Sequence, residues 1–359
     1  MEVKENYQAI ELSLAINELT GKTAWRSPSN IALVKYWGKY GRQLPSNPSV
    51  SFTLKNAHTN MRMNYQPGNG QVVLFFEKER NRAFESRIAD FIKSIEDIYP
   101  FLQGLNLEIH SDNSFPHSAG IASSASAMSA LALCLCSIER QVFGSLTDED
   151  EFLQKASYLS RLASGSACRS VYPKLGQWGD HEKIQGSTNS FAIDVSDAVD
   201  PIFHTFKNSI LIASAKEKSV SSSAGHQLME NNPYAAVRFK QAKDNLAKLM
   251  SAMKKGDIDV FMQIVEEEAL TLHALMMTST PSYVLMKPNS LVLIEKIKAF
   301  REKTGLPVCF TLDAGPNLHV LYPEYIATQV RVFIKEECQL YCENGLIIED
   351  EVGEGAHKL

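Results

Sequence analysis

The passage PHSAGIASSASAMSAL, residues 116–131, combines small residues, hydroxyls and the start of a helix in a way that suits a bound anion. Small residues let the main chain close around phosphate. The amide groups at a helix start, the positive end of the helix dipole and the hydroxyls of Ser123 and Ser124 favour it further. The Walker pattern is absent, because no Gly-Lys-Ser or Gly-Lys-Thr closes the loop. The same residues also fit a small-residue helix packed closely against a neighbour, so this passage alone leaves both interpretations open.

Two lysines and a tyrosine are concentrated in SPSNIALVKYWGK, residues 27–39. Lys35, Tyr36 and Lys39 suit a polyanionic ligand. Alternation along a strand would place Lys35 and Trp37 on one face. The alternative is a strand end whose lysines reach solvent, which is the usual position of lysine side chains.

Two further segments carry an arginine and an aspartate. ASGSACRSVY, residues 163–172, offers the hydroxyls of Ser164 and Ser166 and the guanidinium of Arg169, a planar fork that matches a carboxylate or phosphate. In TLDAGPNLHV, Asp313 precedes a Gly-Pro turn, where backbone amides can fix a carboxylate and point it into a cleft. Taken alone, each segment is better explained as an ordinary turn, with a surface arginine in the first and a common turn aspartate in the second.

Taken together, the four segments resemble a known family. The Pro-x-x-x-Gly-x-x-Ser-Ser-Ala loop is similar to the ATP loop of the GHMP small-molecule kinases. The other three segments resemble, in the same order, the signature segments of the diphosphomevalonate decarboxylases within that superfamily. The resemblance covers the chain from Ser27 to Tyr322, and the N-terminal extension and the C-terminal tail carry none.

This resemblance implies roles for the substrate-facing candidates. Asp313 would be the catalytic carboxylate facing the tertiary hydroxyl of the substrate, Lys35 would lie near the reacting centre, and Arg169 would orient the carboxylate that leaves as CO2. Tyr36 and Lys39 would hold the substrate diphosphate. The full set implied to bind substrate is Asn30, Tyr36, Lys39, Ser164, Ser166, Arg169 and Ser222.

The resemblance also implies two cofactors, ATP and Mg²⁺. The residues implied to bind the nucleotide are Gly120, Ala122, Ser123, Ser124 and Ser126. The metal would be held through the ATP phosphates, with Ser123 or Ser124 as the protein ligand.

The implied reaction is the ATP-dependent decarboxylation of (R)-5-diphosphomevalonate to isopentenyl diphosphate. ADP, phosphate and CO2 are released after phosphorylation of the 3-hydroxyl, which becomes the leaving group. A phosphomevalonate decarboxylase and a mevalonate 3-kinase are alternatives from the same superfamily. The first stays open because Ser223 follows the Val-Ser-Ser of residues 220–222, where the family often has Arg or Thr. A third alternative is a sensor that binds nucleotide or metabolite without turnover.

Composition narrows the possible partners. The formal net charge of −5 and the pI near 6.0 argue against a non-specific binder of nucleic acid or anionic membranes. No stretch approaches the roughly 18 apolar residues of a membrane span, and the start lacks a cationic and apolar signal pattern. We therefore expect a cytoplasmic protein with reduced cysteines, and the resemblance implies a homodimer.

The elements that must position these residues alternate between strand and helix patterns. Strands are expected at 30–37, 49–54, 71–76, 105–113, 189–195 and 208–215, and as a strand, turn and strand over 308–322. Helices are expected at 80–99, after the loop at 116–122, and at 232–268 and 291–305, with Gly305 as a C-terminal stop. Another helix is expected within 148–172, and its far end runs into a Ser- and Gly-rich turn.

This pattern predicts a two-layer α+β protein divided near Pro201. The expected division is an N-terminal extension over 1–22, an N-terminal domain over 23–203 and a C-terminal domain over 204–359. The resemblance implies a GHMP-kinase-like fold. Its N-terminal domain would be similar to ribosomal protein S5 domain 2 and its C-terminal domain ferredoxin-like, with the active site in the cleft between them.

Overall fold

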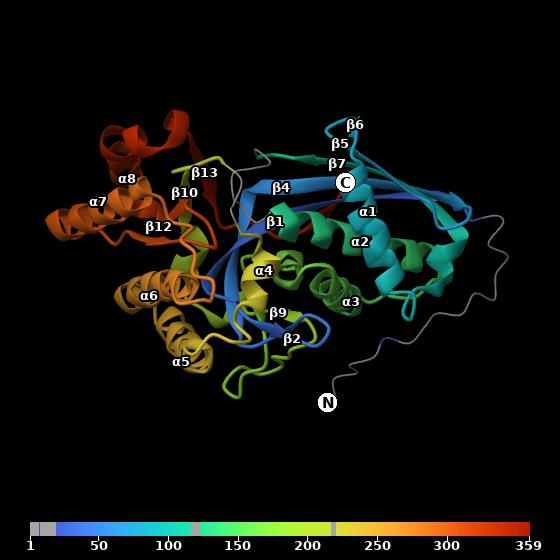
Figure 1. The fold of residues 1–359 in the computed structure, drawn as a ribbon, viewed down its shortest axis with the longest axis horizontal. Helices are drawn as coiled ribbons and strands as arrows, with labels where there is room; N and C mark the ends of the chain where they lie inside the picture. Colours follow the sequence, from blue (N-terminus) through green and yellow to red (C-terminus); the bar gives the residue numbers. More distant parts are fainter. Residues whose placement is uncertain (1–6, 8–18, 116–122, 217–219) are drawn as a thin grey trace.

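The computed structural model describes residues 7, 19–115, 123–216 and 220–359. These residues form two large sheets with helices packed against them and one small hairpin (Figure 1). The strands of the first sheet run in the order β14-β1-β4-β7-β5-β6, with β8 attached to β4 and β9 to β8. The second sheet has the order β11-β12-β10-β13 and is antiparallel throughout. This confirms the α+β architecture of two domains.

The first sheet is built on two long strands, β1 (Gly21–Val34) and β4 (Ser49–Pro67), which pair in antiparallel fashion along most of their length. The other strands of this sheet are β5 (Val72–Phe76), β6 (Glu79–Arg80), β7 (Leu105–Asn113), β8 (Leu175–Trp178), β9 (Ala192–Asp194) and β14 (His357–Lys358). A separate small hairpin, β2 (Lys39–Tyr40) with β3 (Leu44–Pro45), follows β1.

Three helices pack against the first sheet: α1 (Arg82–Ser94), α2 (Ser123–Phe143) and α3 (Glu149–Ala163). Their starts follow standard capping chemistry, since the side chain of Asn81 accepts from Phe84 N–H and that of Asp148 from Glu151 N–H. Residues 128–139, in the middle of α2, are all buried, which is consistent with its run of small and apolar residues. The helix expected within 148–172 ends at Ala163, and a 3-10 segment, η3 (Gly165–Val171), follows it.

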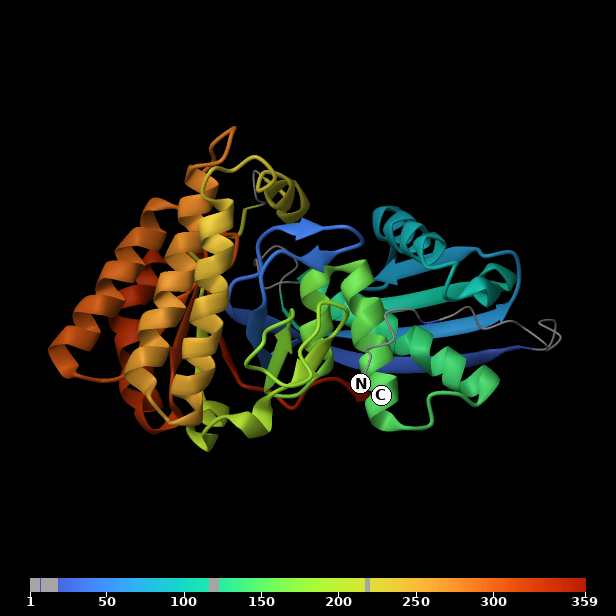
Figure 2. The same ribbon diagram turned by 90° about the horizontal axis from the view of Figure 1, so that it is seen from below.

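The second sheet comprises β10 (Lys207–Leu211), β11 (Cys309–Thr311), β12 (Leu318–Tyr322) and β13 (Ile347–Glu351). Helices α5 (Ala235–Lys254), α6 (Ile258–Met277) and α7 (Pro288–Thr304) lie side by side next to it (Figure 2), and the shorter helices are α4 (Ser222–Gln227) and α8 (Ala327–Phe333). Gly305, left-handed with φ 68°, ends α7 as predicted. None of the helices in the described ranges is long and apolar enough to cross a membrane.

Three expectations about the elements were wrong in detail. The helical region expected over 232–268 is two helices, because Gly256 takes φ 71° and Asp257 caps the start of α6. The strand expected over 30–37 begins earlier, at Gly21, and ends at Val34. Lys35 and Trp37 therefore do not alternate along a strand, and the main-chain N–H of Lys35 is bonded to a side chain of α6 instead of a neighbouring strand.

The chain crosses back to the first sheet at its C-terminal end, where β14 pairs with β1 (Figure 2). The buried carboxylate of Asp350 in β13 fixes this crossing. Its Oδ1 accepts from the N–H groups of Lys55 and Asn56 at 3.0 and 2.8 Å, and its Oδ2 from that of Ala57 at 2.8 Å. The division near Pro201 places the strands of the two sheets in separate parts of the chain, except that β14, at the C-terminal end, belongs to the first sheet. The exact domain boundaries stay a prediction.

The Asp350→Asn variant should be less stable, because its amide group would present a donor to the N–H of Ala57 and leave that buried group without an acceptor. We expect the free energy of unfolding to fall by about 2 kcal/mol, measured by urea denaturation. Asp97→Asn, which removes one partner of the exposed Arg42–Asp97 pair, is the control and should change it by less than about 0.5 kcal/mol. Equal effects of the two substitutions would contradict this role for Asp350.

Candidate active site

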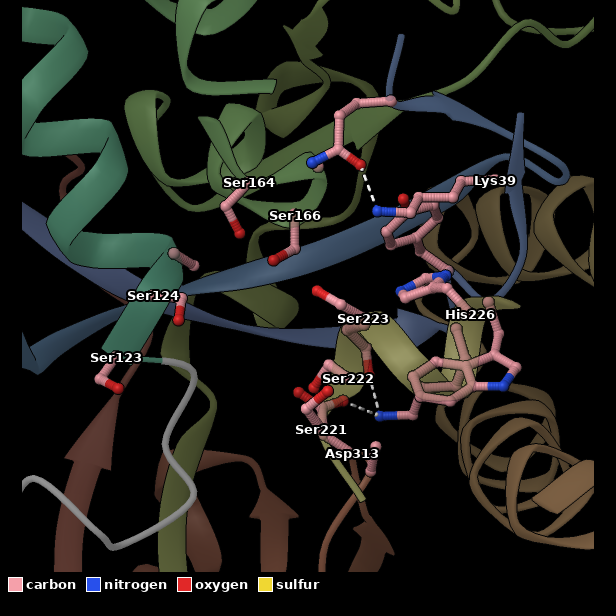
Figure 3. Close-up of a pocket in the computed structure, with 18 of the residues that line it drawn as sticks. Lys39, Ser123, Ser124, Ser164, Ser166, Ser221, Ser222, Ser223, His226 and Asp313 are labelled. Atoms are coloured by element: carbon pink, nitrogen blue, oxygen red, sulfur yellow. Dashed lines mark hydrogen bonds and ion pairs between the residues drawn. The ribbon is translucent and has the colours of Figure 1, made fainter. Parts of the chain in front are cut away.

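A cavity of about 630 Å³ is lined by residues of β1, of several helices and of segments that follow strands of both sheets. Figure 3 shows the labelled serines, Lys39, His226 and Asp313 arranged around this common space. The residues singled out in the sequence that line it are Lys35, Tyr36, Lys39, Ser123, Ser124, Ser164, Ser166, Arg169, Ser222 and Asp313. The four separate sequence segments therefore converge on one cavity.

An ion pair between Lys35 and Asp313 joins the two sheets at this cavity. Lys35 Nζ lies 2.8 Å from Asp313 Oδ1, and the same ammonium donates to the carbonyl of Ala32 at 2.6 Å. The Lys35 side chain is 1% exposed and that of Asp313 is 32% exposed. Burial lowers the pKa of Lys35, and the Asp313 carboxylate opposes that shift. The pair thus presents a carboxylate to the cavity with a buried cation directly behind it.

Arg169 is buried and oriented by residues of the two long strands. Its Nε donates to Ser51 Oγ at 2.5 Å, one terminal nitrogen donates to Ser49 Oγ at 2.7 Å, and the other donates to Asn30 Oδ1 at 3.4 Å. A guanidinium has five N–H donors, so two remain beyond these three bonds. Because Arg169 also lines the cavity, these donors suit a planar anion held there.

The cavity carries a surplus of positive charge in a protein of net negative charge. Lys39 has a neutral partner, Gln43, whose Oε1 accepts from its Nζ at 2.7 Å, and burial lowers the pKa of Lys39. The cationic side chains of the lining are Lys35, Lys39, Arg87, Arg169 and Lys216, whereas Asp313 is the single acidic residue among the described lining residues. Such a surplus attracts ligands with several negative charges.

The start of α2 adds neutral donors to the cavity. Ser123 and Ser124 lie in its first turn and line the cavity, where the positive end of the helix dipole favours an anion. A smaller cavity of about 180 Å³ adjoins it through Arg87, Ser123 and Ser124. Its other lining residues are mainly apolar: Met61, Leu74, Phe76, Phe84, Ile88, Ser111, Asn113, Ala127 and Met128.

Four predicted site residues are not placed at the cavity. Gly120 and Ala122 lie outside the described residues. Asn30 is buried behind Arg169 and donates through Nδ2 to Ser170 Oγ at 2.7 Å. Ser126 is also buried, and its hydroxyl is bonded to that of Thr59 at 2.7 Å. Among the described residues, Asn30 and Ser126 therefore face other protein groups and not the cavity.

His226 lines the cavity and was not singled out in the sequence. Its Nδ1 accepts from the N–H of Gly38 at 2.9 Å, and its ring lies 4.4 Å from the ring of Tyr36 and 4.5 Å from that of Trp37. Burial, helped by the charge of Lys39, lowers the pKa of His226 to about 3, so the imidazole is neutral at pH 7. Gly38 takes φ 95°, a conformation that favours glycine. One signal in the sequence could have identified His226, namely its position three residues after Ser223.

No group of three or more His, Cys, Asp or Glu side chains suited to a metal occurs in the part of the chain that the structure describes. A metal in this cavity would depend on hard oxygen donors. Those near the start of α2 are the hydroxyls of Ser123 and Ser124, which fit Mg²⁺ when most of its ligands are phosphate and water oxygens.

Family models match both parts of the chain. Residues 27–192 match the diphosphomevalonate decarboxylase-like N-terminal domain, and residues 209–350 match the mevalonate 5-diphosphate decarboxylase C-terminal domain. The chain is 30% identical to a diphosphomevalonate decarboxylase of Gibberella zeae over 322 residues, 83% of this chain and 80% of that protein. It is 28% identical to the diphosphomevalonate decarboxylase of Saccharomyces cerevisiae over 319 residues, 82% of this chain and 76% of that protein.

Solved structures agree with these matches. The mevalonate diphosphate decarboxylase of Staphylococcus aureus superimposes with a TM-score of 0.82 at 26% identity, covering 96% of this chain and 100% of that chain. A protein termed MDDEF, solved in complex with MVAPP, AMPPCP and magnesium, gives a TM-score of 0.81 at 25% identity, covering 95% of this chain and 99% of that one.

The Lys39→Met variant should bind inorganic pyrophosphate more weakly, because the substitution removes a cation from the cavity and keeps a side chain of similar length. We expect the dissociation constant, measured by calorimetry at fixed ionic strength, to rise at least about tenfold. Lys240→Met, which alters an exposed lysine paired with Asp244, is the control and should leave the affinity unchanged. Equal affinities of all three proteins would show that Lys39 does not contact the anion.

Proposed function

The chain belongs to the diphosphomevalonate decarboxylase family, and on this premise we propose that it converts (R)-5-diphosphomevalonate to isopentenyl diphosphate at the expense of ATP. ADP, phosphate and CO2 are the other products. The observation that carries the proposal is the Lys35–Asp313 pair beside Arg169 in one cavity with a surplus of cations. That arrangement supplies a carboxylate for the hydroxyl, a guanidinium for the substrate carboxylate and cations for phosphate groups.

We propose that the substrate lies with its diphosphate near Tyr36 and Lys39. The hydroxyls of Ser164, Ser166 and Ser222, all at the cavity, would donate to phosphate oxygens. Charged and neutral donors together suit a diphosphate, since each oxygen accepts more than one hydrogen bond. This placement would bring the other end of the substrate towards Asp313 and Arg169.

Asp313 is proposed to act on the 3-hydroxyl. Its carboxylate would orient the hydroxyl and take its proton as the γ-phosphoryl group is transferred from ATP, and Lys35 would stabilise the negative charge on the transferred group. When the new phosphate departs, positive charge grows at the tertiary carbon. The departing phosphate would take the proton from Asp313, and the carboxylate, negative again, would stabilise that positive charge electrostatically.

Arg169 is proposed to hold the substrate carboxylate through the two donors left by its protein contacts. A carboxylate fixed in this way is aligned for loss as CO2 while the 3-phosphate leaves. Asn30 would act through Arg169, since its Oδ1 accepts from that guanidinium and it does not line the cavity. Ser49 and Ser51 would share this orienting role.

ATP is proposed to lie with its phosphates at the start of α2 and its base in the adjoining apolar cavity. Ser123 and Ser124 line both cavities, which supports a ligand that extends from one into the other. Gly120, Ala122 and Ser126 stay predicted members of this site, with Ser126 acting through packing of the α2 start. Ser123 or Ser124 would hold Mg²⁺, which would supply positive charge to offset that of the ATP phosphates.

The remaining features follow from family membership. We propose that the N-terminal domain has the topology of ribosomal protein S5 domain 2 and that the C-terminal domain is ferredoxin-like. We also propose that the protein works in the cytoplasm as a homodimer, and that the chain divides into an N-terminal extension over 1–22 and domains over 23–203 and 204–359.

The proposed function is tested by incubating the protein with ATP, Mg²⁺ and, in separate reactions, mevalonate, its 5-phosphate and its 5-diphosphate. We expect ADP and CO2 in equal amounts and the highest kcat/KM with the diphosphate. Ser223, at the cavity where the family often has Arg or Thr, makes the monophosphate a second candidate substrate. ADP without CO2 would indicate a 3-kinase, and binding without either product would indicate a sensor.

The Asp313→Asn variant should lose most of its activity, because it keeps the shape of the side chain and removes the charge that acts on the hydroxyl. We expect kcat to fall by roughly 10³-fold or more while the affinity for ATP changes little. Asp244→Asn, at the exposed Lys240–Asp244 pair, is the control and should retain wild-type kcat. Turnover by Asp313→Asn near the wild-type rate would refute the role of this carboxylate.

A further inference from the structure

Helix α6 contacts the main chain on both sides of the Lys35–Asp313 pair. Glu268 Oε2 accepts from the N–H of Lys35 at 2.9 Å, and five residues later His273 Nε2 donates to the carbonyl of Asp313 at 3.1 Å. Between them, Leu272 lines the cavity. We infer that Glu268 and His273 are positioning residues, which fix the distance between Lys35 and Asp313; their role in turnover depends on the proposed function.

The ion pair needs such a support because its two members lie on separate segments, each of which follows a strand of a different sheet. Lys35 lies directly after the last residue of β1, and Asp313 lies two residues after the end of β11. The main chain at Lys35 and at Asp313 therefore lies beyond the hydrogen-bonded part of its strand. A salt bridge alone would not define their geometry, since a lysine side chain has several rotatable bonds. Bonds from one rigid helix to both backbones define it better.

Glu268 is held firmly enough to serve as an anchor. Its side chain is fully buried, and in addition to Lys35 N–H it accepts from Arg238 at 2.5 Å and from Asn245 at 2.8 Å. A buried carboxylate requires such partners, because transfer of an unpaired charge from water costs several kcal/mol. With both oxygens bonded, Glu268 fixes the start of the Lys35–Lys39 segment.

His273 holds the turn that carries Asp313. Its side chain is buried, and since a carbonyl only accepts, Nε2 bears the hydrogen in this bond. The same carbonyl accepts from Gly315 N–H at 2.7 Å, and Ser290 Oγ donates to the carbonyl of Pro316 at 2.6 Å. The backbone of the turn is thereby fixed on the side of the helices, while the Asp313 carboxylate faces Lys35 and the cavity.

Five variants and the wild type test this inference. His273→Leu removes the donor, whereas His273→Gln keeps an N–H donor at a similar distance from the backbone. Glu268→Asp keeps the charge that Arg238 requires and shortens the reach to Lys35 N–H. The matched control for the histidine is His181→Leu: His181 is equally buried and donates through Nε2 to the carbonyl of Lys243 at 3.2 Å, away from the cavity. The control for the glutamate is Glu139→Asp, at the buried Lys155–Glu139 pair.

If the inference is right, kcat falls by about 100-fold in His273→Leu and by about tenfold in Glu268→Asp, because a displacement of about 1 Å at a reacting group has effects of this size. His273→Gln should stay within about fivefold of wild type, and the KM for substrate should stay within about twofold in every variant. Both controls should keep wild-type kcat, although their melting temperatures fall as much as those of the test variants. A wild-type kcat in folded His273→Leu, or equal losses in test and control variants, would overturn the inference.

Crystal structures of His273→Leu and His273→Gln give a second measurement that does not depend on turnover. We expect the distance between Lys35 Nζ and Asp313 Oδ1, 2.8 Å in the wild type, to be kept in His273→Gln and lost in His273→Leu. An unchanged distance in His273→Leu would refute the positioning role. If the wild type itself releases no ADP or CO2, the proposed function fails, and these two structures still decide the role of His273.

Discussion

The whole site depends on one ion pair formed between two sheets. Lys35 is buried, and an ammonium at such a depth stays charged only where a carboxylate lies close to it. Asp313 is the carboxylate beside Lys35, and its side chain remains partly exposed towards the cavity. The charge of each residue thus stabilises the charge of the other. The two residues follow strands of different sheets, which is why the site lies where these two segments meet.

The long strands of the first sheet serve the same site from the other side. Ser49 and Ser51 on β4 and Asn30 on β1 accept from Arg169, so the guanidinium is oriented by neutral groups and keeps its full charge for a ligand. A carboxylate in place of any of these three residues would satisfy Arg169 within the protein and weaken its attraction for an anion. The same reasoning applies to Lys39, whose protein partner is the neutral Gln43.

The sequence identified the residues with charges and hydroxyls far better than the residues that hold them. Asp313, Arg169 and Lys35 were recognised because each lies in a local pattern that resembles the family. Glu268 and His273 have no such pattern, and their partners lie 233 and 40 residues away in the chain, so only the fold reveals them. The strands β7 and β12 were predicted closely since their alternation is local. The early half of β1 was missed because Pro28 interrupts it, at a shift in register that the sequence does not display.

The neutral groups at the proposed diphosphate end of the cavity follow from the same balance of charge. His226 lies beside Lys39, and a protonated imidazole there would add a second cation. Burial between the rings of Tyr36 and Trp37 keeps it neutral, and its Nδ1 is used to fix Gly38 in the segment that carries Lys39. The proposed diphosphate end therefore offers one lysine and several hydroxyls. An anion held in this way is bound by directed hydrogen bonds as much as by charge, which permits its release as part of the product.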